Sequence, residues 1–148
     1  MTDKIEPFRY VIRVRYGECD GQHVVYNPKY GEYFDLASTE FLRAAAAPAS
    51  AFDGSFEFQV VKLLVEWSAP ARFDDVLEVS VRATRVGNTS FVLGYEIRKA
   101  GEADTIVTGE TVNVHVDSKT WQKKQISPQM RERLLNGASG KTVDQSGR

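Results

Sequence analysis

The amino-acid sequence predicts an α+β domain in which one long helix packs against an antiparallel sheet. Apolar and polar residues alternate between Phe8 and Tyr16, as in a strand with one buried face. From Pro28, apolar residues recur at three- and four-residue steps, which gives a helix one broad apolar stripe. After Phe56 the chain alternates again until near its end. One early helix followed by half-polar strands is an α+β pattern, and such strands suit an antiparallel sheet with one buried face.

Length and composition bound the class of protein. The chain has 148 residues, of which 42% are hydrophobic and 26% charged, as expected for one soluble globular domain. The net charge is -1 and the longest basic run is Lys123-Lys124, so we expect no nucleic-acid partner. Cys19 is the single cysteine, which excludes an intrachain disulfide and favours a reducing, cytoplasmic location. Residues 1–7 lack the apolar core of a signal peptide, and no segment is apolar enough to span a membrane, so we expect no membrane partner.

The first strand and the helix are joined by a short loop. The strand is expected over residues 8–16, where apolar positions alternate with arginines. Asn27 suits the N-cap of the helix and Pro28 suits its first position, where the missing N–H costs nothing. The apolar stripe of the helix consists of Tyr30, Tyr33, Phe34, Ala37, Phe41, Leu42 and Ala45. We expect the helix to end near Pro48.

Four further strands follow the helix. Alternation predicts them over residues 61–67, 77–84, 90–98 and 112–116, with turn-like segments between them. Ser127 is then expected to cap a short helix that runs to Leu135. We expect a single domain over residues 1–136. The tail, residues 137–148, is polar and contains Gly and Ser, so we expect it to be disordered.

The loop region over residues 14–30 is the most informative part of the chain. It holds the end of a strand, a carboxylate at Asp20 and a helix start at Asn27-Pro28. A carboxylate beside the free N–H groups of a helix N-terminus is what cleavage of an acyl bond requires. Asp20-Gly21 is also an ordinary turn dipeptide, so spacing alone leaves both interpretations open.

The motifs along residues 8–117 resemble, in type and in order, the hotdog-fold acyl-CoA thioesterases, in particular the 4-hydroxybenzoyl-CoA thioesterase-like branch. The acidic loop and the helix carry most of this resemblance, at Tyr16, Glu18-Cys19-Asp20, Val24-Val25, Tyr26-Asn27, Tyr30, Tyr33-Phe34-Asp35 and Glu40-Phe41-Leu42. Residues 67–75 resemble the family's crossing between its second and third strands, and residues 85–91 resemble its hairpin into the fourth strand.

The resemblance implies a hotdog fold, in which an antiparallel five-stranded sheet wraps around one long central helix. It also implies a homodimer or homotetramer with active sites at the subunit interface. The expected activity is hydrolysis of an acyl-CoA to a free acid and CoA. No metal and no cofactor are expected, because CoA is part of the substrate.

The resemblance also assigns residues to the expected site. Asp20 is the expected catalytic carboxylate, acting as nucleophile or as general base on water. The expected oxyanion and substrate-binding positions are His23, Val25, Tyr26, Asn27 and Tyr30. The CoA arm is expected near Lys62, Thr89 and Ser90 of a neighbouring subunit. Relatives commonly carry a glycine where this chain has His23, whereas its own glycine is Gly21.

Other residues with reactive side chains are weaker candidates. Cys19 suits a small packing role, and His115 is expected to face solvent or the far side of the sheet. On the helix, Glu32 and Asp35 are expected to be solvated or paired. Glu40 is the alternative carboxylate, because it lies beside the apolar stripe.

Two functions other than hydrolysis stay open. A non-catalytic acyl-CoA-binding module would keep the pocket and lose the acid, so the presence of Asp20 counts against it. A dehydratase acting on hydroxyacyl thioesters would pair an Asp with a His in one site, and His23 is close enough to Asp20 in sequence to keep this function open.

Overall fold

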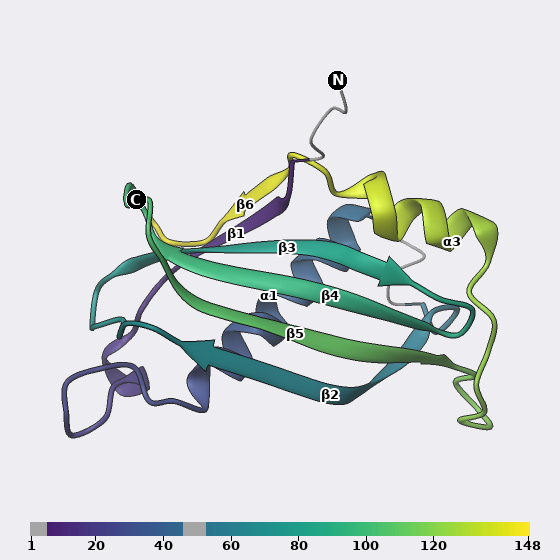
Figure 1. Cartoon of the computed structure of the whole chain (residues 1–148), viewed down its shortest axis with the longest axis horizontal. Coiled ribbons are helices and arrows are strands. Elements are labelled where there is room, and N and C mark those ends of the chain that lie inside the picture. Colours follow the sequence, from purple (N-terminus) through teal and green to yellow (C-terminus); the bar gives the residue numbers. More distant parts are fainter. Residues whose placement is uncertain (1–5, 46–52) are drawn as a thin grey trace.

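The computed structural model describes residues 6–45 and 53–148. Its main feature is a sheet in the strand order β2-β5-β4-β3-β1-β6, with α1 packed against one face (Figure 1). The strands are β1 (Phe8–Arg13), β2 (Glu57–Trp67), β3 (Val76–Val86), β4 (Ser90–Lys99), β5 (Thr105–Val116) and β6 (Thr142–Asp144). The helical segments are η1 (Tyr16–Glu18), α1 (Lys29–Ala45), α3 (Pro128–Glu132) and η2 (Arg133–Gly137).

The sheet corrects two expectations. Over the described residues it has six strands rather than five, and β6 lies parallel to β1, whereas the other neighbouring pairs are antiparallel. Residues 142–144 of the tail, which is expected to be disordered, form β6. The N–H of Gln145 donates to the carbonyl of Val11 at 2.7 Å, and the Tyr10 hydroxyl donates to the Gln145 side chain at 2.5 Å. A three-residue strand is too short to give a periodic signal, which is why the sequence did not predict it.

The central helix is in the expected place but is short. It spans 17 residues, about 25 Å at the helical rise, and begins at Lys29, one residue after Pro28. The predicted end near Pro48 lies outside the described residues. The apolar stripe is buried as predicted, and the ring of Phe34 stacks on Tyr95 with centroids 4.3 Å apart. Burial of each such ring contributes about 1.5–3 kcal/mol to stability.

The short helix after the sheet also agrees with the sequence. The Ser127 hydroxyl accepts a hydrogen bond from the N–H of Met130 at 3.0 Å, so Ser127 caps α3 as predicted. Leu134 in η2 is buried against the core. The helix therefore closes one end of the layer between the sheet and α1.

One residue of β5 departs from its predicted position. His115 is buried rather than facing solvent, with 4% of its surface exposed. The centroid of its ring lies 4.7 Å from that of Phe56. The burial pattern of β5 places Thr111, Asn113 and His115 in the core, whereas Val112 and Val114 are only partly buried. The residues of β5 alternate as predicted, but the buried face is the one that carries Thr111, Asn113 and His115.

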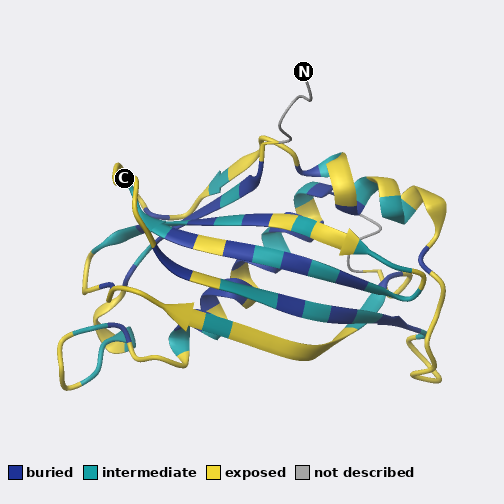
Figure 2. Cartoon of the chain, in the orientation of Figure 1, coloured by how far each residue is buried: buried dark blue, intermediate teal, exposed yellow. Residues whose placement is uncertain are grey.

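The strand β2 forms a bare edge of the sheet. Among the described residues it pairs with β5 alone, and Figure 2 shows it exposed along most of its length. Its exposed side chains include Val60, Val61, Leu63, Leu64 and Trp67. A long apolar edge strand of this kind invites pairing with another chain.

Candidate active site

The loop between β1 and α1 folds into a small hairpin that closes on itself. The N–H of Asp20 donates to the carbonyl of Val24 at 2.9 Å, and Cys19 forms a β-bridge with Val25. The N–H of Tyr26 donates to the carbonyl of Glu18 at 2.9 Å. These bonds hold the acidic segment beside the start of α1.

Asp20 combines the turn that its sequence suggests with an available oxygen. Its Oδ1 accepts a hydrogen bond from the N–H of Gln22 at 2.8 Å, which is an Asx turn. Its backbone carbonyl accepts from the N–H of His23 at 3.0 Å. Within residues 6–45 and 53–148, Oδ2 of Asp20 has no hydrogen-bond partner. The turn therefore fixes the carboxylate without using both of its oxygens.

The peptide groups before α1 differ in what their N–H groups do. The N–H of Val25 donates to the carbonyl of Ala71 at 2.8 Å, and the N–H of Tyr26 is bonded to Glu18. Pro28 has no N–H. The N–H of Asn27 makes no hydrogen bond within the part of the chain that the structure describes. It is the available donor at the positive end of the α1 dipole, where a developing oxyanion is stabilised.

Two hollows open beside Asn27. One, of about 270 Å³, lies between the loop and the segment after β2, and is lined by Val24, Val25, Asn27, Tyr30, Trp67, Ser68, Ala69 and Pro70. The other, of about 290 Å³, lies between α1 and β2, and is lined by Asn27, Pro28, Gly31, Leu63, Val65 and Trp67. Both hollows share Asn27 and Trp67. The predicted positions Val25, Asn27 and Tyr30 are thus brought together, while Asp20 lies across the hairpin from Val24 and lines neither hollow.

Tyr30 and Tyr26 have different environments. The Tyr30 hydroxyl accepts a hydrogen bond from the N–H of Ala71 at 3.2 Å, and burial raises the pKa of Tyr30 above its usual value. The hydroxyl of Tyr30 therefore stays protonated, and its ring is held in place as one side of the hollow. Tyr26 is 54% exposed.

His23 lies at the tip of the hairpin. It is exposed, lines neither hollow and has φ of 64°, in the left-handed region that favours glycine. This backbone conformation explains why a glycine suits the position. Among the described residues no hydrogen bond joins the His23 ring to Asp20, so the geometry does not support the acid–base pair that a dehydratase would need.

Glu18 has a structural role that the sequence did not reveal. Its Oε1 accepts hydrogen bonds from the Tyr33 hydroxyl at 3.1 Å and from the N–H of Arg15 at 2.8 Å. Burial and the neighbouring Glu18 charge hold the pKa of Tyr33 well above its usual value, so Tyr33 remains a donor. An acid five residues after β1 and a tyrosine on the buried helix stripe are the signal that could have indicated this pair.

The other helix acids are partnered or exposed. Glu32 pairs with Lys29 at 3.0 Å, as expected, and Asp35 is exposed. Glu40, the alternative carboxylate, pairs with Arg43 at 3.3 Å.

Of the residues predicted to hold the CoA arm, Thr89 and Ser90 lie away from Asn27 in the same chain. Lys62 pairs with Glu110 at 2.9 Å in the middle of β2. Ser90 is opposite Val114 of β5, whereas Trp67 is opposite Val107. Seven residues along β5 correspond to about 23 Å, so Thr89 and Ser90 could reach the site only from another subunit, as the prediction states.

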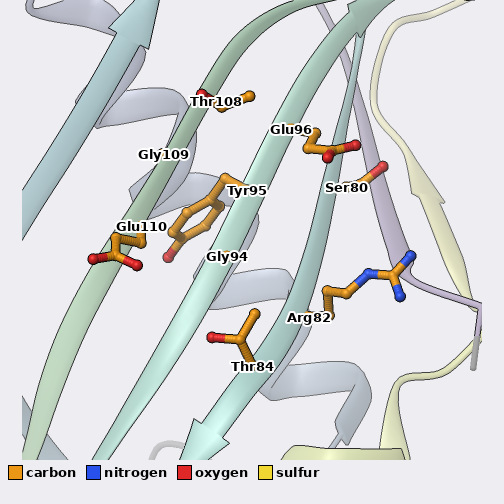
Figure 3. A pocket seen from close by; sticks show the side chains of 9 residues that line it. All are labelled: Ser80, Arg82, Thr84, Gly94, Tyr95, Glu96, Thr108, Gly109 and Glu110. Carbon is orange, nitrogen blue, oxygen red and sulfur yellow. The ribbon is translucent and has the colours of Figure 1, made fainter.

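A third hollow lies on the face of the sheet away from α1. It has a volume of about 300 Å³ and is shown in Figure 3, where Ser80, Arg82, Glu96 and Glu110 project from β3, β4 and β5 with α1 behind them. It contains side chains of both charges and no helix N-terminus. It therefore lacks the oxyanion donor that the hollows beside Asn27 share.

The described residues contain no cluster of three His, Cys, Asp or Glu side chains that could hold a metal ion. No helix in the described part of the chain is long and apolar enough to cross a membrane.

The chain is similar to several known proteins. A family model described as the thioesterase-like superfamily matches residues 14–134. The acyl-CoA thioester hydrolase YbgC of Escherichia coli O6:H1 is 36% identical over 106 residues, which cover 68% of this chain and 79% of that protein. The structure of a hypothetical protein from Aquifex aeolicus superposes with a TM-score of 0.78 at 28% identity, and covers 86% of this chain and 99% of that one.

A structure of a 4-hydroxybenzoyl-CoA thioesterase mutant in complex with 4-hydroxybenzoyl-CoA superposes with a TM-score of 0.75 at 17% identity. The match covers 85% of this chain and 96% of that one. At this identity the likeness concerns the fold alone.

Proposed function

The chain belongs to the thioesterase-like superfamily and is an acyl-CoA thioester hydrolase, and we propose that Asp20 and the N–H of Asn27 carry its chemistry. The observation that supports this assignment most is the N–H of Asn27, which makes no hydrogen bond among the described residues and belongs to a residue that lines two hollows. When a thioester carbonyl oxygen accepts a hydrogen bond from this N–H, its carbonyl carbon becomes more electrophilic. Asp20 is held in the adjoining hairpin by its own turn.

The reaction then proceeds in one of two ways. As a nucleophile, Asp20 forms an acyl anhydride, CoA leaves as a thiolate and takes up a proton, and water cleaves the anhydride. As a general base, Asp20 takes a proton from water, the resulting hydroxide adds to the carbonyl carbon, and the intermediate expels the thiolate, which is then protonated. Both routes convert acyl-CoA and water into a carboxylic acid and CoA. In both, the Asn27 N–H stabilises the oxyanion.

The assembly predicted from the resemblance, a homodimer or homotetramer, remains part of this proposal. The bare apolar edge of β2 supports it, because a second copy would remove these side chains from water. Within such an assembly Lys62, Thr89 and Ser90 of a neighbouring subunit would bind the CoA arm. The cytoplasmic location stays a prediction.

The test is thiol release from a panel of short, long and aromatic acyl-CoAs. We expect Asp20→Asn to lower kcat by about 10²–10⁴-fold, since it removes the base or nucleophile while keeping the shape of the side chain. Asp35→Asn is the matched control, because Asp35 is an exposed carboxylate on α1 that lines neither hollow. Circular dichroism checks that both variants are folded.

Equal activity of Asp20→Asn and the wild type would remove Asp20 from the mechanism. Binding of acyl-CoA without thiol release by the wild type would favour the non-catalytic binding module instead. Hydration of an enoyl-CoA by the wild type would favour the dehydratase.

A further inference from the structure

The indole of Trp67 lies between the two hollows that flank Asn27. It lines both of them, and half of its surface is exposed, at 50%. Its ring meets that of Tyr30 edge-on, with centroids 6.2 Å apart. Tyr30 is buried and its hydroxyl is bonded to Ala71, so it gives the indole a fixed support. The position of Trp67 is therefore set by the fold, although its outer face is open.

The two hollows differ in chemistry. The hollow between α1 and β2, which we call the helix branch, is lined beyond Asn27 and Trp67 by Pro28, Gly31, Leu63 and Val65. These residues offer an apolar surface. The hollow beside the segment after β2, which we call the loop branch, includes the backbone of residues 68–70.

The backbone of the loop branch offers free acceptors. The N–H groups of Ser68 and Ala69 donate to the carbonyl of Ile106, at 2.9 and 3.4 Å. Within the described residues, the carbonyl oxygens of Ser68, Ala69 and Pro70 accept no hydrogen bond. Such oxygens suit a ligand that carries amide N–H groups, as the pantetheine arm of CoA does. The apolar helix branch suits the hydrocarbon part of an acyl group.

We propose that Trp67 separates an acyl branch from a pantetheine branch, and thereby limits the size of the acyl group that this thioesterase accepts. The inference rests on the proposed function, because it places the thioester carbonyl at the N–H of Asn27, where the two branches meet. The acyl group enters the helix branch and the CoA arm follows the loop branch. The preferred substrates are thioesters of apolar acids, since a carboxylate at the end of the acyl group would be desolvated without a partner.

Gly31 forms the narrow part of the helix branch. A methyl group added at Gly31 would lie 3.2 Å from Cδ2 of Leu63, so the branch would lose space where α1 and β2 approach each other. Gly31 lies within α1 and has no positive φ, so alanine fits its backbone and favours the helix. Trp67→Ala and Gly31→Ala should therefore change the acyl branch in opposite directions.

The experiment compares kcat/KM for acetyl-, hexanoyl-, dodecanoyl-, benzoyl- and succinyl-CoA in four proteins: the wild type, Trp67→Ala, Gly31→Ala and Trp121→Ala. Trp121 is the matched control, since it is 58% exposed and lies in the turn after β5, away from both branches. We expect Trp67→Ala to raise the dodecanoyl-to-hexanoyl ratio by about tenfold or more, the scale that hydrophobic pockets give for small changes in size. Gly31→Ala should lower that ratio, and Trp121→Ala should leave it unchanged.

A uniform loss of activity on all substrates in Trp67→Ala, with an unchanged ratio, would overturn the proposal. So would a wild-type preference for succinyl-CoA. Dissociation constants for the same acyl-CoAs, measured by calorimetry, keep this inference separate from the proposed function. If the wild type releases no thiol, the same shift in affinity with chain length would still support the partition, and its absence would reject it.

Discussion

At the residue scale, the loop before α1 uses its two carboxylates differently. Glu18 accepts hydrogen bonds from Tyr33 and from the N–H of Arg15, so its charge holds the loop against the helix. Asp20 has one oxygen in a turn and another without a partner among the described residues. The sequence places both acids in one three-residue run. Which of them is available for chemistry depends on Tyr33, which is 15 residues from Glu18 in the chain.

The hydroxyl of Tyr33 gives the first prediction. Tyr33→Phe keeps the buried ring but removes the hydrogen bond that the Tyr33 hydroxyl donates to the Glu18 carboxylate. We expect a loss of about 1–3 kcal/mol in the free energy of unfolding, as for a hydrogen bond to a charged group. We also expect kcat to fall by roughly tenfold with little change in KM, because the loop that holds Asp20 is less well positioned. Urea unfolding and steady-state kinetics measure the two effects.

Tyr16→Phe is the matched control for this prediction. Tyr16 is 80% exposed and makes an edge contact with Phe73, but its hydroxyl has no hydrogen bond in the described part of the chain. The control should resemble the wild type. Unchanged kinetics in Tyr33→Phe would show that Glu18 does not position the loop.

His115 gives a prediction about pH. Its two ring nitrogens are buried without a hydrogen-bond partner among the described residues, and burial, with the charge of Lys124, lowers its pKa. Because the pKa of His115 is lower in the folded state, the unfolded chain binds more protons than the folded protein does as the pH falls. Its contribution to stability is therefore complete above pH 6.5, the ordinary histidine pKa, and is lost as the pH falls below it.

We expect His115→Leu to reduce the loss of stability between pH 6.5 and pH 5. The difference in slope should be at most about 1.4 kcal/mol per pH unit, the value for one proton. Thermal unfolding of both proteins across this range measures it. Identical slopes would show that other groups set the acid sensitivity.

At the scale of elements, the sequence predicted where most strands lie but not which face of β5 is buried. In β4 the alternating residues Phe91, Leu93, Tyr95 and Ile97 are buried, as apolar residues should be. In β5 hydrogen bonds satisfy two of the inward-facing polar residues: Tyr95 bonds to Thr111 at 2.9 Å, and Asn113 donates to the carbonyl of Phe91 at 3.3 Å. These partners come from another strand, so the local pattern could not reveal them.

Gly109 in β5 gives a prediction about how closely the elements pack. A methyl group at this position would lie 2.3 Å from the carbonyl oxygen of Leu64 and 2.4 Å from Cε2 of Phe34. Neither α1 nor β2 can move away without losing contacts. We expect Gly109→Ala to lower the free energy of unfolding by about 1–3 kcal/mol, the usual cost of overpacking.

Gly17→Ala is the control, because a methyl group there meets nothing within 4 Å. Its effect should stay within about 0.5 kcal/mol. Chemical unfolding of the two variants beside the wild type decides the comparison. A Gly109→Ala protein as stable as the control would mean that α1 and the sheet are packed less tightly than the distances indicate.

At the scale of the whole molecule, the fold class and the candidate site were predictable for different reasons. The alternating strands and the apolar stripe of α1 are local patterns, so periodicity found them. The site residues Val25, Asn27 and Tyr30 lie close together in sequence, and their clustering was predictable. Trp67 belongs to a strand 40 residues after Asn27, and only the fold brings it there. The pairing of β6 with β1 joins the two ends of the chain and has no local signature.

The two edges of the sheet differ, because β2 is long and exposed whereas β6 is a three-residue strand that covers β1. The tail that carries β6 gives the last prediction. Besides the Gln145 bonds, the tail accepts a hydrogen bond from Nε of Arg13 at the carbonyl of Ser146, at 3.0 Å. Removing residues 142–148 takes away these bonds and leaves the buried Tyr10 hydroxyl without its acceptor. The truncation also removes the pairing of β6 with β1, so at about 1 kcal/mol for each bond we expect a loss of at least roughly 3 kcal/mol in the free energy of unfolding.

The same truncation uncovers the edge of β1, so the protein should also form larger species on size-exclusion chromatography. Removing only residues 147–148 is the control, since it costs the exposed Arg148–Asp144 ion pair, which contributes little. If the long truncation matched this control in both stability and size, the tail would not protect the edge of β1. Association of the truncated protein with unchanged stability would instead show that the tail acts against edge pairing rather than for the fold.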